Sequence, residues 1–148
     1  MQKNVIMSVD HLSKDFVIRG KKLGEKNKLL HALSDVSFDI YEGETLGIIG
    51  ESGCGKSTLG KSICKLIEPT DGSIVLDGEE IAKYTQKQMR PIRKKVQMVF
   101  QDPYASLNPR MTVGEIIAEP LNIQKRYKTK EETRAHVLKV MEVVGLNT

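Results

Sequence analysis

The chain has 148 residues, of which 39% are hydrophobic and 28% are charged, and it carries a formal charge of +4. These proportions are ordinary for one soluble globular domain, so they exclude global disorder, a collagen-like chain and a disulfide-rich miniprotein. No apolar run approaches the roughly 20 residues that span a bilayer, and the first ten residues lack a secretory signal pattern. The sequence therefore predicts a protein that stays in the cytoplasm.

The two cysteines, Cys54 and Cys64, predict reduced thiols rather than a disulfide framework or a metal site. The sequence has no Cys-x-x-Cys pair, and none of its three histidines stands at metal-ligand spacing. The positive charge gathers in three clusters, at residues 19–28, 83–95 and 125–130. Because no zinc finger, aromatic RNA-binding pair or arginine-rich tract accompanies them, a solvated surface is favoured over a nucleic-acid interface.

In chain order, the first third of the sequence reads as β structure. Short strands are predicted at residues 6–9 and 16–18, an exposed loop at 19–28, a half-buried strand at 36–40, a turn at 42–43 and a fully buried strand at 45–49. A glycine loop at residues 50–57 follows. A helix comes next, with apolar residues at helical spacing up to Pro69.

Beyond that helix, a strand is predicted at residues 73–76 with a turn at 77–78. A short basic helix or turn interrupted at Pro91 follows, and then a buried strand at 96–100. The later part reads as helical, with helices at 113–121 and 129–144 and Gly145 as a C-terminal cap. In the second helix, Ala135, Leu138, Met141 and Val144 share one face. Residues 1–103 and 104–148 are predicted to be separate lobes.

Residues 50–57, GESGCGKS, fit the phosphate-loop pattern G-x-x-x-x-G-K-[ST] at every fixed position. Glycines at 50, 53 and 55 allow positive φ and close backbone approach, so that N–H groups can converge on phosphate oxygens. Lys56 supplies a charge for the β- and γ-phosphates, the Ser57 hydroxyl is suited to Mg²⁺, and Thr58 can donate to the α-phosphate. The predicted nucleotide-binding residues of this loop are Gly50, Glu51, Ser52, Gly53, Cys54, Gly55, Lys56, Ser57 and Thr58. Cys54 occupies a free position and is assigned no redox role.

The phosphate loop alone leaves kinases, GTPases, helicases and transport ATPases open. A second block decides among them: FQDPYASLNPRMTV, at residues 100–113, closely resembles the Q-loop region of ATP-binding cassette (ABC) transporters. The segments GETLGIIGESGCGKSTLGKSI and DGSIVLDG are similar to the same family. The resemblance is to the ATP-binding subunits of oligopeptide, dipeptide and nickel importers, and it runs from about residue 8 to residue 146. It implies an α/β fold, an incomplete P-loop NTPase core with antiparallel β elements and the start of a helical subdomain.

The resemblance also implies roles for two residues outside the loop. Gln101 matches the Q-loop glutamine, a candidate sensor that reaches Mg²⁺ or the attacking water, so Ser57 and Gln101 are the predicted metal ligands. Phe16 matches the position where the family stacks an aromatic ring on adenine, although a β-strand core residue is the competing interpretation. The implied cofactors are ATP and Mg²⁺.

Several parts of the family's catalytic machinery are missing from these 148 residues. No LSGGQ-like signature, no apolar strand ending in Asp-Glu and no switch histidine is found, and His136 has the wrong context for that switch. The expectation is therefore an amino-terminal part that binds nucleotide, hydrolyses little or no ATP and is marginally soluble. In addition, the strand predicted at 45–49 should lack a neighbour.

In an intact relative the resemblance implies transmembrane permease subunits and a second ATP-binding subunit as partners, with a substrate-binding protein engaged indirectly. The location it implies is peripheral, on the cytoplasmic side of the cell membrane. The predicted function is thus the ATP-binding subunit of an ABC importer, with peptides as the expected cargo. Two alternatives stay open: a non-catalytic nucleotide-binding or regulatory module, and a basic nucleic-acid-binding module, which would bind DNA with steep salt dependence.

Overall fold

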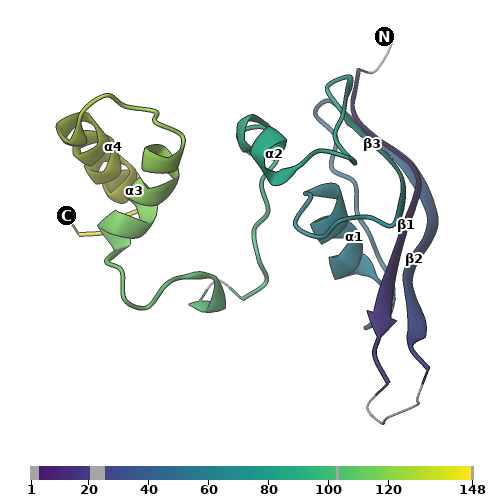
Figure 1. Ribbon diagram of the computed structural model, residues 1–148. Helices are drawn as coiled ribbons and strands as arrows, with labels where there is room; N and C mark the ends of the chain where they lie inside the picture. Colours follow the sequence, from purple (N-terminus) through teal and green to yellow (C-terminus); the bar gives the residue numbers. More distant parts are fainter. Residues whose placement is uncertain (1–3, 21–25, 103, 148) are drawn as a thin grey trace. The chain divides into compact units, whose positions relative to one another are not determined.

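A computed structural model describes residues 4–20, 26–102 and 104–147 of the chain. The chain divides into two compact units, residues 1–98 and residues 99–148 (Figure 1). Part of the loop predicted at residues 19–28, and Pro103 in the later loop, lie outside the described residues. The functional division predicted at residues 103 and 104 stays a prediction.

The first unit is built on a four-stranded antiparallel sheet with the strand order β2-β1-β3-β4. The strands are β1 (Val5–Ile18), β2 (Lys28–Tyr41), β3 (Asp71–Leu76) and β4 (Glu79–Glu80). β1 joins the two short strands predicted at 6–9 and 16–18, because β2 pairs with it along nearly its whole length. The strands predicted at 36–40 and 73–76 are confirmed within β2 and β3. Asp77 and Gly78 both have positive φ, which is the conformation of a tight hairpin turn.

A polar irregularity interrupts the pairing of β1 with β2. His11 and Asp35 both have positive φ, and the register shifts between Val9 and Leu12. The N–H of His11 donates to the Ser37 hydroxyl at 2.8 Å. This bulge explains why the buried positions of β1 are Met7, Val9 and then Leu12, three residues on, instead of keeping a strict alternation.

The bulge yields a prediction for the ionisation of His11, which is fully exposed. Nδ1 of His11 lies 2.5 Å from an Asp35 carboxylate oxygen, and this hydrogen bond, followed by the charges of Asp10 and Asp35, raises the pKa of His11 above its ordinary value of 6.5. Asp35→Asn is expected to lower that pKa, measured by NMR titration of the His11 ring protons. The pair stabilises the fold fully below about pH 6.5, and this contribution is lost as pH rises through the raised pKa. A His11 pKa unchanged by the substitution would contradict this account.

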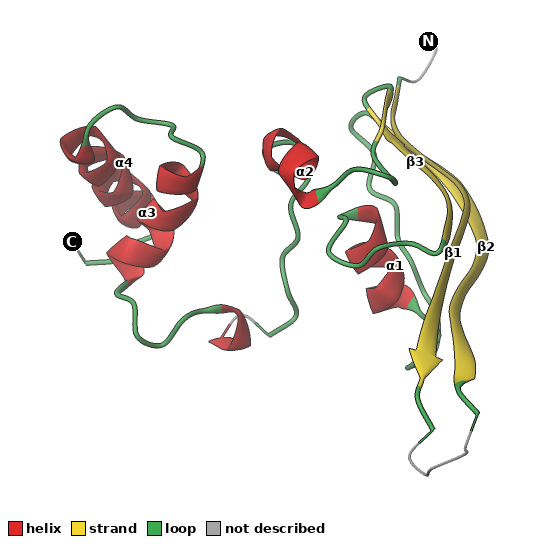
Figure 2. Ribbon diagram, in the orientation of Figure 1, coloured by secondary structure: helices red, strands yellow, loops and turns green. Residues whose placement is uncertain are grey.

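Helices α1 (Lys56–Ile63) and α2 (Gln86–Ile92) cover one face of the sheet (Figure 2). Leu59 from α1 and Met89 and Ile92 from α2 are buried with strand residues in one apolar core. The core residues are Met7, Val9, Leu12, Leu33, Leu59, Ile74, Leu76, Ile81, Ala82, Met89 and Ile92. α2 runs through Pro91 and ends one residue later, so the interruption predicted at Pro91 is wrong. Pro91 is the second-to-last residue of α2, so its missing N–H and its ring affect only the end of the helix.

Two predicted buried strands are absent from the part of the chain that the structure describes. Residues 45–49 and 96–100 are assigned to no strand, and no described segment forms a hydrogen-bonded ladder with either. Several of their apolar side chains stay open to solvent: Ile49 is 97% exposed and Val99 is 94% exposed, whereas Val96 is half-buried against the core. Apolar sequence favours a buried strand only where neighbouring strands and a covering layer are present, so these predictions of burial are wrong.

The second unit contains a 3₁₀ turn, η1 (Tyr104–Ser106), and two packed helices, α3 (Val113–Ile123) and α4 (Lys130–Val143). Both predicted helices are confirmed, and so is the Gly145 cap. Gly145 has a φ of 72°, and its N–H and that of Leu146 donate back to Glu142 and Met141.

The packing face predicted for α4 is wrong in part, because the burial falls elsewhere. α4 buries Thr133 and Val137, whereas Ala135, Leu138 and Val144 are exposed and Met141 is half-buried. Packing against α3 selects the buried face, and spacing within α4 alone does not identify it. No helix in the described ranges has both the length and the apolarity to cross a membrane.

Candidate nucleotide-binding site

The phosphate loop leads directly into α1, and its last glycine is required by its surroundings. Gly55 is the N-cap residue of α1 and has a φ of 98°. A Cβ at this position would stand 2.5 Å from the carbonyl oxygen of Ala32 and 3.2 Å from Cδ2 of Leu33. Positive φ and the close approach of β2 both exclude a side chain here. The backbone of the loop is therefore seated against the middle of β2.

The amino terminus of α1 differs from those of the other three described α-helices. α2, α3 and α4 each begin at a threonine whose hydroxyl accepts a backbone hydrogen bond in a capping box. α1 has no side-chain cap and no acidic residue in its first turn. Within the described residues, the N–H groups of Gly55, Lys56 and Ser57 have no hydrogen-bond partner. Such a set of free donors at the positive end of a helix is suited to phosphate oxygens.

The ammonium group of Lys56 ties the two ends of the loop together. It donates to the carbonyl oxygen of Gly50 at 2.7 Å and to that of Glu51 at 2.5 Å, and it lies 3.5 Å from the thiol of Cys54. Lys56 thus places its positive charge at the first residues of the phosphate loop. The two carbonyl contacts were not foreseen from the sequence, because nothing in the spacing of the motif specifies them.

The remaining loop residues are accessible. Gly50, Glu51, Ser52, Gly53, Cys54 and Ser57 are exposed, and Thr58 is half-buried. The Ser57 hydroxyl is therefore open to a ligand, as a Mg²⁺ site beside bound phosphates would require. No group of three or more His, Cys, Asp or Glu residues that could hold a metal ion exists in the described ranges. An exposed hydroxyl fits Mg²⁺ as one oxygen ligand, with phosphate oxygens of a bound nucleotide as further ligands.

Phe16 lies on the strand next to the one that supports the loop. It pairs with Leu30 of β2, and Ala32, whose carbonyl approaches Gly55, is two residues further along that strand. The ring is half-buried, and the ammonium group of Lys14 lies 5.0 Å from its centroid. The position on the sheet suits a ring that contacts a base, and the partial burial also fits the competing core role. The stacking role of Phe16 stays a prediction.

Gln101 belongs to the second unit, whereas the phosphate loop belongs to the first. Its side chain is exposed. The loop after it is ordered by Asp102, whose side chain accepts from the N–H of Tyr104 at 3.0 Å and whose carbonyl accepts from the Ser106 hydroxyl at 2.9 Å. The sensor role of Gln101 also stays a prediction.

The first unit combines three features: an antiparallel sheet, a glycine loop seated on β2, and a helix whose first N–H groups have no hydrogen-bond partner among the described residues. Together with the loop sequence, they define an α/β protein of the P-loop nucleotide-binding class.

Residues 33–148, which are most of the chain, match the ABC transporter family. The chain therefore belongs to that family. It is 50% identical over 144 residues to the oligopeptide transport ATP-binding protein OppF of Bacillus subtilis, covering 96% of this chain and 45% of that protein. It is 43% identical over 146 residues to OppF of Escherichia coli, covering 97% of this chain and 44% of that protein. The chain thus spans less than half the length of these relatives.

Among solved structures, the chain resembles the ATP-binding cassette MJ0796 in a dimeric post-hydrolysis state bound to ADP and Pi. The TM-score is 0.77 and the sequence identity is 30%, and the match covers 95% of this chain and 58% of that one. The predicted fold class, an ABC ATPase core with antiparallel β elements, is confirmed by this match.

Proposed function

We propose that this chain binds ATP together with Mg²⁺, as the nucleotide-binding part of the ATP-binding subunit of an ABC importer for peptides. The observation that carries the proposal is the loop at the start of α1, where the N–H groups from Gly55 to Ser57 are free and the Lys56 ammonium group is held at the carbonyl oxygens of Gly50 and Glu51 in the same loop. The names of the OppF relatives support peptides as the cargo.

In this proposal each side chain has a separate task. The N–H groups of Gly55, Lys56 and Ser57 would hold phosphate oxygens, and Lys56 would neutralise their charge. Ser57 and Gln101 would ligate Mg²⁺, and Phe16 would contact the adenine ring. When bound, ATP supplies the phosphoryl group whose transfer to water would drive transport.

The proposed assembly follows from the family and from the dimer formed by the solved cassette. The chain would act on the cytoplasmic face of the cell membrane, peripheral to transmembrane permease subunits, and would pair with a second ATP-binding subunit. Association with a substrate-binding protein would be indirect.

A non-catalytic nucleotide-binding or regulatory role is the second candidate. The 148 residues contain no apolar run that ends in Asp-Glu, the pair that would supply the water-activating base. Both candidates require ATP binding at the same loop. They differ in whether this chain has a catalytic role once partners are present.

The purified 148-residue chain is expected to bind ATP without hydrolysing it. Binding is measured by calorimetry with Mg²⁺ present, and hydrolysis by phosphate release over several hours. Heat of binding with phosphate release no higher than that of a Lys56→Ala control supports the proposal. Phosphate release that depends on Lys56 would show that the missing motifs are dispensable, and absence of binding would refute the nucleotide-binding role itself.

A further inference from the structure

The basic cluster at residues 125–130 forms the turn between α3 and α4, and this turn is held rigidly at both ends. At the end of α3, Lys125 has a φ of 48°, and the N–H of Arg126 donates to Leu121 at 3.0 Å. At the start of α4, a carboxylate oxygen of Glu132 accepts from the N–H groups of Lys128 and Thr129 at 3.0 and 3.3 Å. The backbone that carries Arg126 to Lys128 is therefore preorganised.

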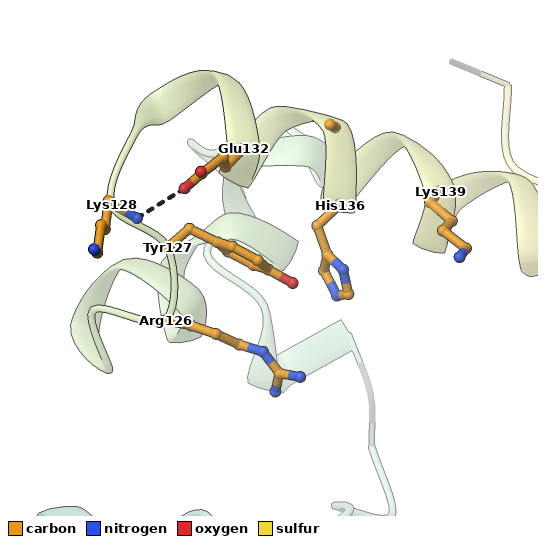
Figure 3. Close-up of a pocket in the computed structure, with 7 residues that line it drawn as sticks. Arg126, Tyr127, Lys128, Glu132, His136 and Lys139 are labelled. Atoms are coloured by element: carbon orange, nitrogen blue, oxygen red, sulfur yellow. Dashed lines mark hydrogen bonds between the residues drawn. The ribbon is translucent and has the colours of Figure 1, made fainter.

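This turn and the first three turns of α4 line an open hollow of about 670 Å³. Its lining residues are Arg126, Tyr127, Lys128, Glu132, Ala135, His136 and Lys139. Figure 3 shows the side chains of Arg126, Tyr127 and His136 turned toward a common space, with Lys139 further along α4. The Tyr127 and His136 rings lie 5.3 Å apart between centroids, at an angle of 40°. The volume falls in the range of small-molecule sites.

The charges around the hollow are unbalanced. In the part of the chain that the structure describes, the side chains of Arg126, Lys128 and Lys139 form no ion pair, although each is close to the hollow. Glu132 is the only carboxylate in the lining, and its oxygen is engaged by the backbone of the turn. The Lys128 side chain points away from the common space and the Glu132 carboxylate is turned to the backbone of the turn (Figure 3), so the charges of Arg126 and Lys139 meet no carboxylate there, which matches a doubly charged anion.

We propose that this hollow is a binding site for a phosphate monoester, separate from the phosphate loop and independent of the proposed function. A phosphate monoester carries close to two negative charges at neutral pH and offers three strong acceptor oxygens. The Arg126 guanidinium can take two of these oxygens through its fork, and Lys139 adds a point charge. Tyr127 and His136 offer further donors and a ring surface for the organic part of the ligand. A carboxylate would leave one of the two positive charges uncompensated.

The test uses the full chain with Lys56→Ala, so that binding of the phosphate ester to the phosphate loop does not contribute to the signal. Glycerol 3-phosphate is titrated at constant ionic strength, and binding is followed by the ring-proton NMR signal of His136, assigned with His136→Gln. A saturable shift is expected. Arg126→Gln with Lys139→Gln should weaken the affinity about tenfold or more, because charge-assisted hydrogen bonds are lost.

Arg134→Gln is the matched control, because Arg134 is an exposed cation on α4 outside this hollow. It should leave the titration within about twofold of the parent. The proposal is overturned by a signal that does not saturate, by equal weakening in the control, or by unaltered binding in the double variant whose helix content by circular dichroism is intact.

A second arm separates the two sources of a phosphate monoester. Flotation with vesicles of phosphatidylcholine containing phosphatidic acid is compared with pure phosphatidylcholine. Vesicle binding that the double variant loses and Arg134→Gln keeps would assign the site to a lipid headgroup. Saturable glycerol 3-phosphate binding without vesicle binding would assign it to a soluble phosphate ester.

Discussion

Replacing Lys56 with alanine is expected to weaken ATP binding by this chain about a hundredfold. Each charge-assisted hydrogen bond contributes about 1.5–3 kcal/mol, and the Lys56 ammonium has two within the loop that phosphate oxygens would replace. The loop itself should survive, since its backbone is seated on β2 through Gly55 and not through Lys56. Calorimetry with Mg²⁺ and ATP measures the change.

Lys61→Ala is the matched control for this experiment. Lys61 lies in the last turn of the same helix, and no hydrogen bond or ion pair of its side chain is found in the described residues. Lys61→Ala removes one positive charge, as Lys56→Ala does, but at the other end of α1 from the free N–H groups of Gly55 to Ser57. Equal weakening by both substitutions would mean that ATP responds to the overall charge of the chain, and the site assignment would then be wrong.

Replacing Lys65 with alanine is expected to destabilise the first unit by about 3 kcal/mol. Lys65 is completely buried, and its ammonium group donates to the carbonyl oxygen of Ala82 at 2.6 Å and pairs with Glu68. Alanine would leave that carbonyl without a donor and would open a cavity next to the core. Urea unfolding followed by circular dichroism measures the loss.

Lys65→Met separates the two causes of this loss. Methionine keeps most of the aliphatic volume and removes only the charge and the donor, while Glu68 is 60% exposed and can turn to water. The expected loss is then about 1–2 kcal/mol. If methionine and alanine cost the same, the cavity contributes nothing. If neither has an effect, the burial of Lys65 is not part of the stability of this unit.

Much of the fold followed from local sequence. The helices from Lys56 and Val113 and the strand at residues 73–76 were predicted because their apolar spacing acts over a few residues, although the first helix ends at Ile63 and not near Pro69 as predicted. The Gly145 cap was predicted for the same reason, since a positive φ after a helix favours glycine strongly.

The predictions that are wrong depend on which other segment packs against the one in question. Residues 45–49 and 96–100 have strand-like sequences, yet no described segment pairs with them, and Ile49 and Val99 stay almost fully exposed. α4 buries Thr133 and Val137 instead of the predicted face, because α3 selects the face. Neither outcome is encoded within the segment itself.

The sequence by itself determined the phosphate-loop pattern of residues 50–57 and the family, because these depend on residue type at fixed spacing. Only the tertiary structure decided that Ala32 requires glycine at position 55, that Lys65 is buried against Ala82, and that Arg126 and Lys139 share one hollow. The reason is physical. Spacing along the chain is set by covalent geometry, whereas contacts between distant residues arise only when strands and helices pack together.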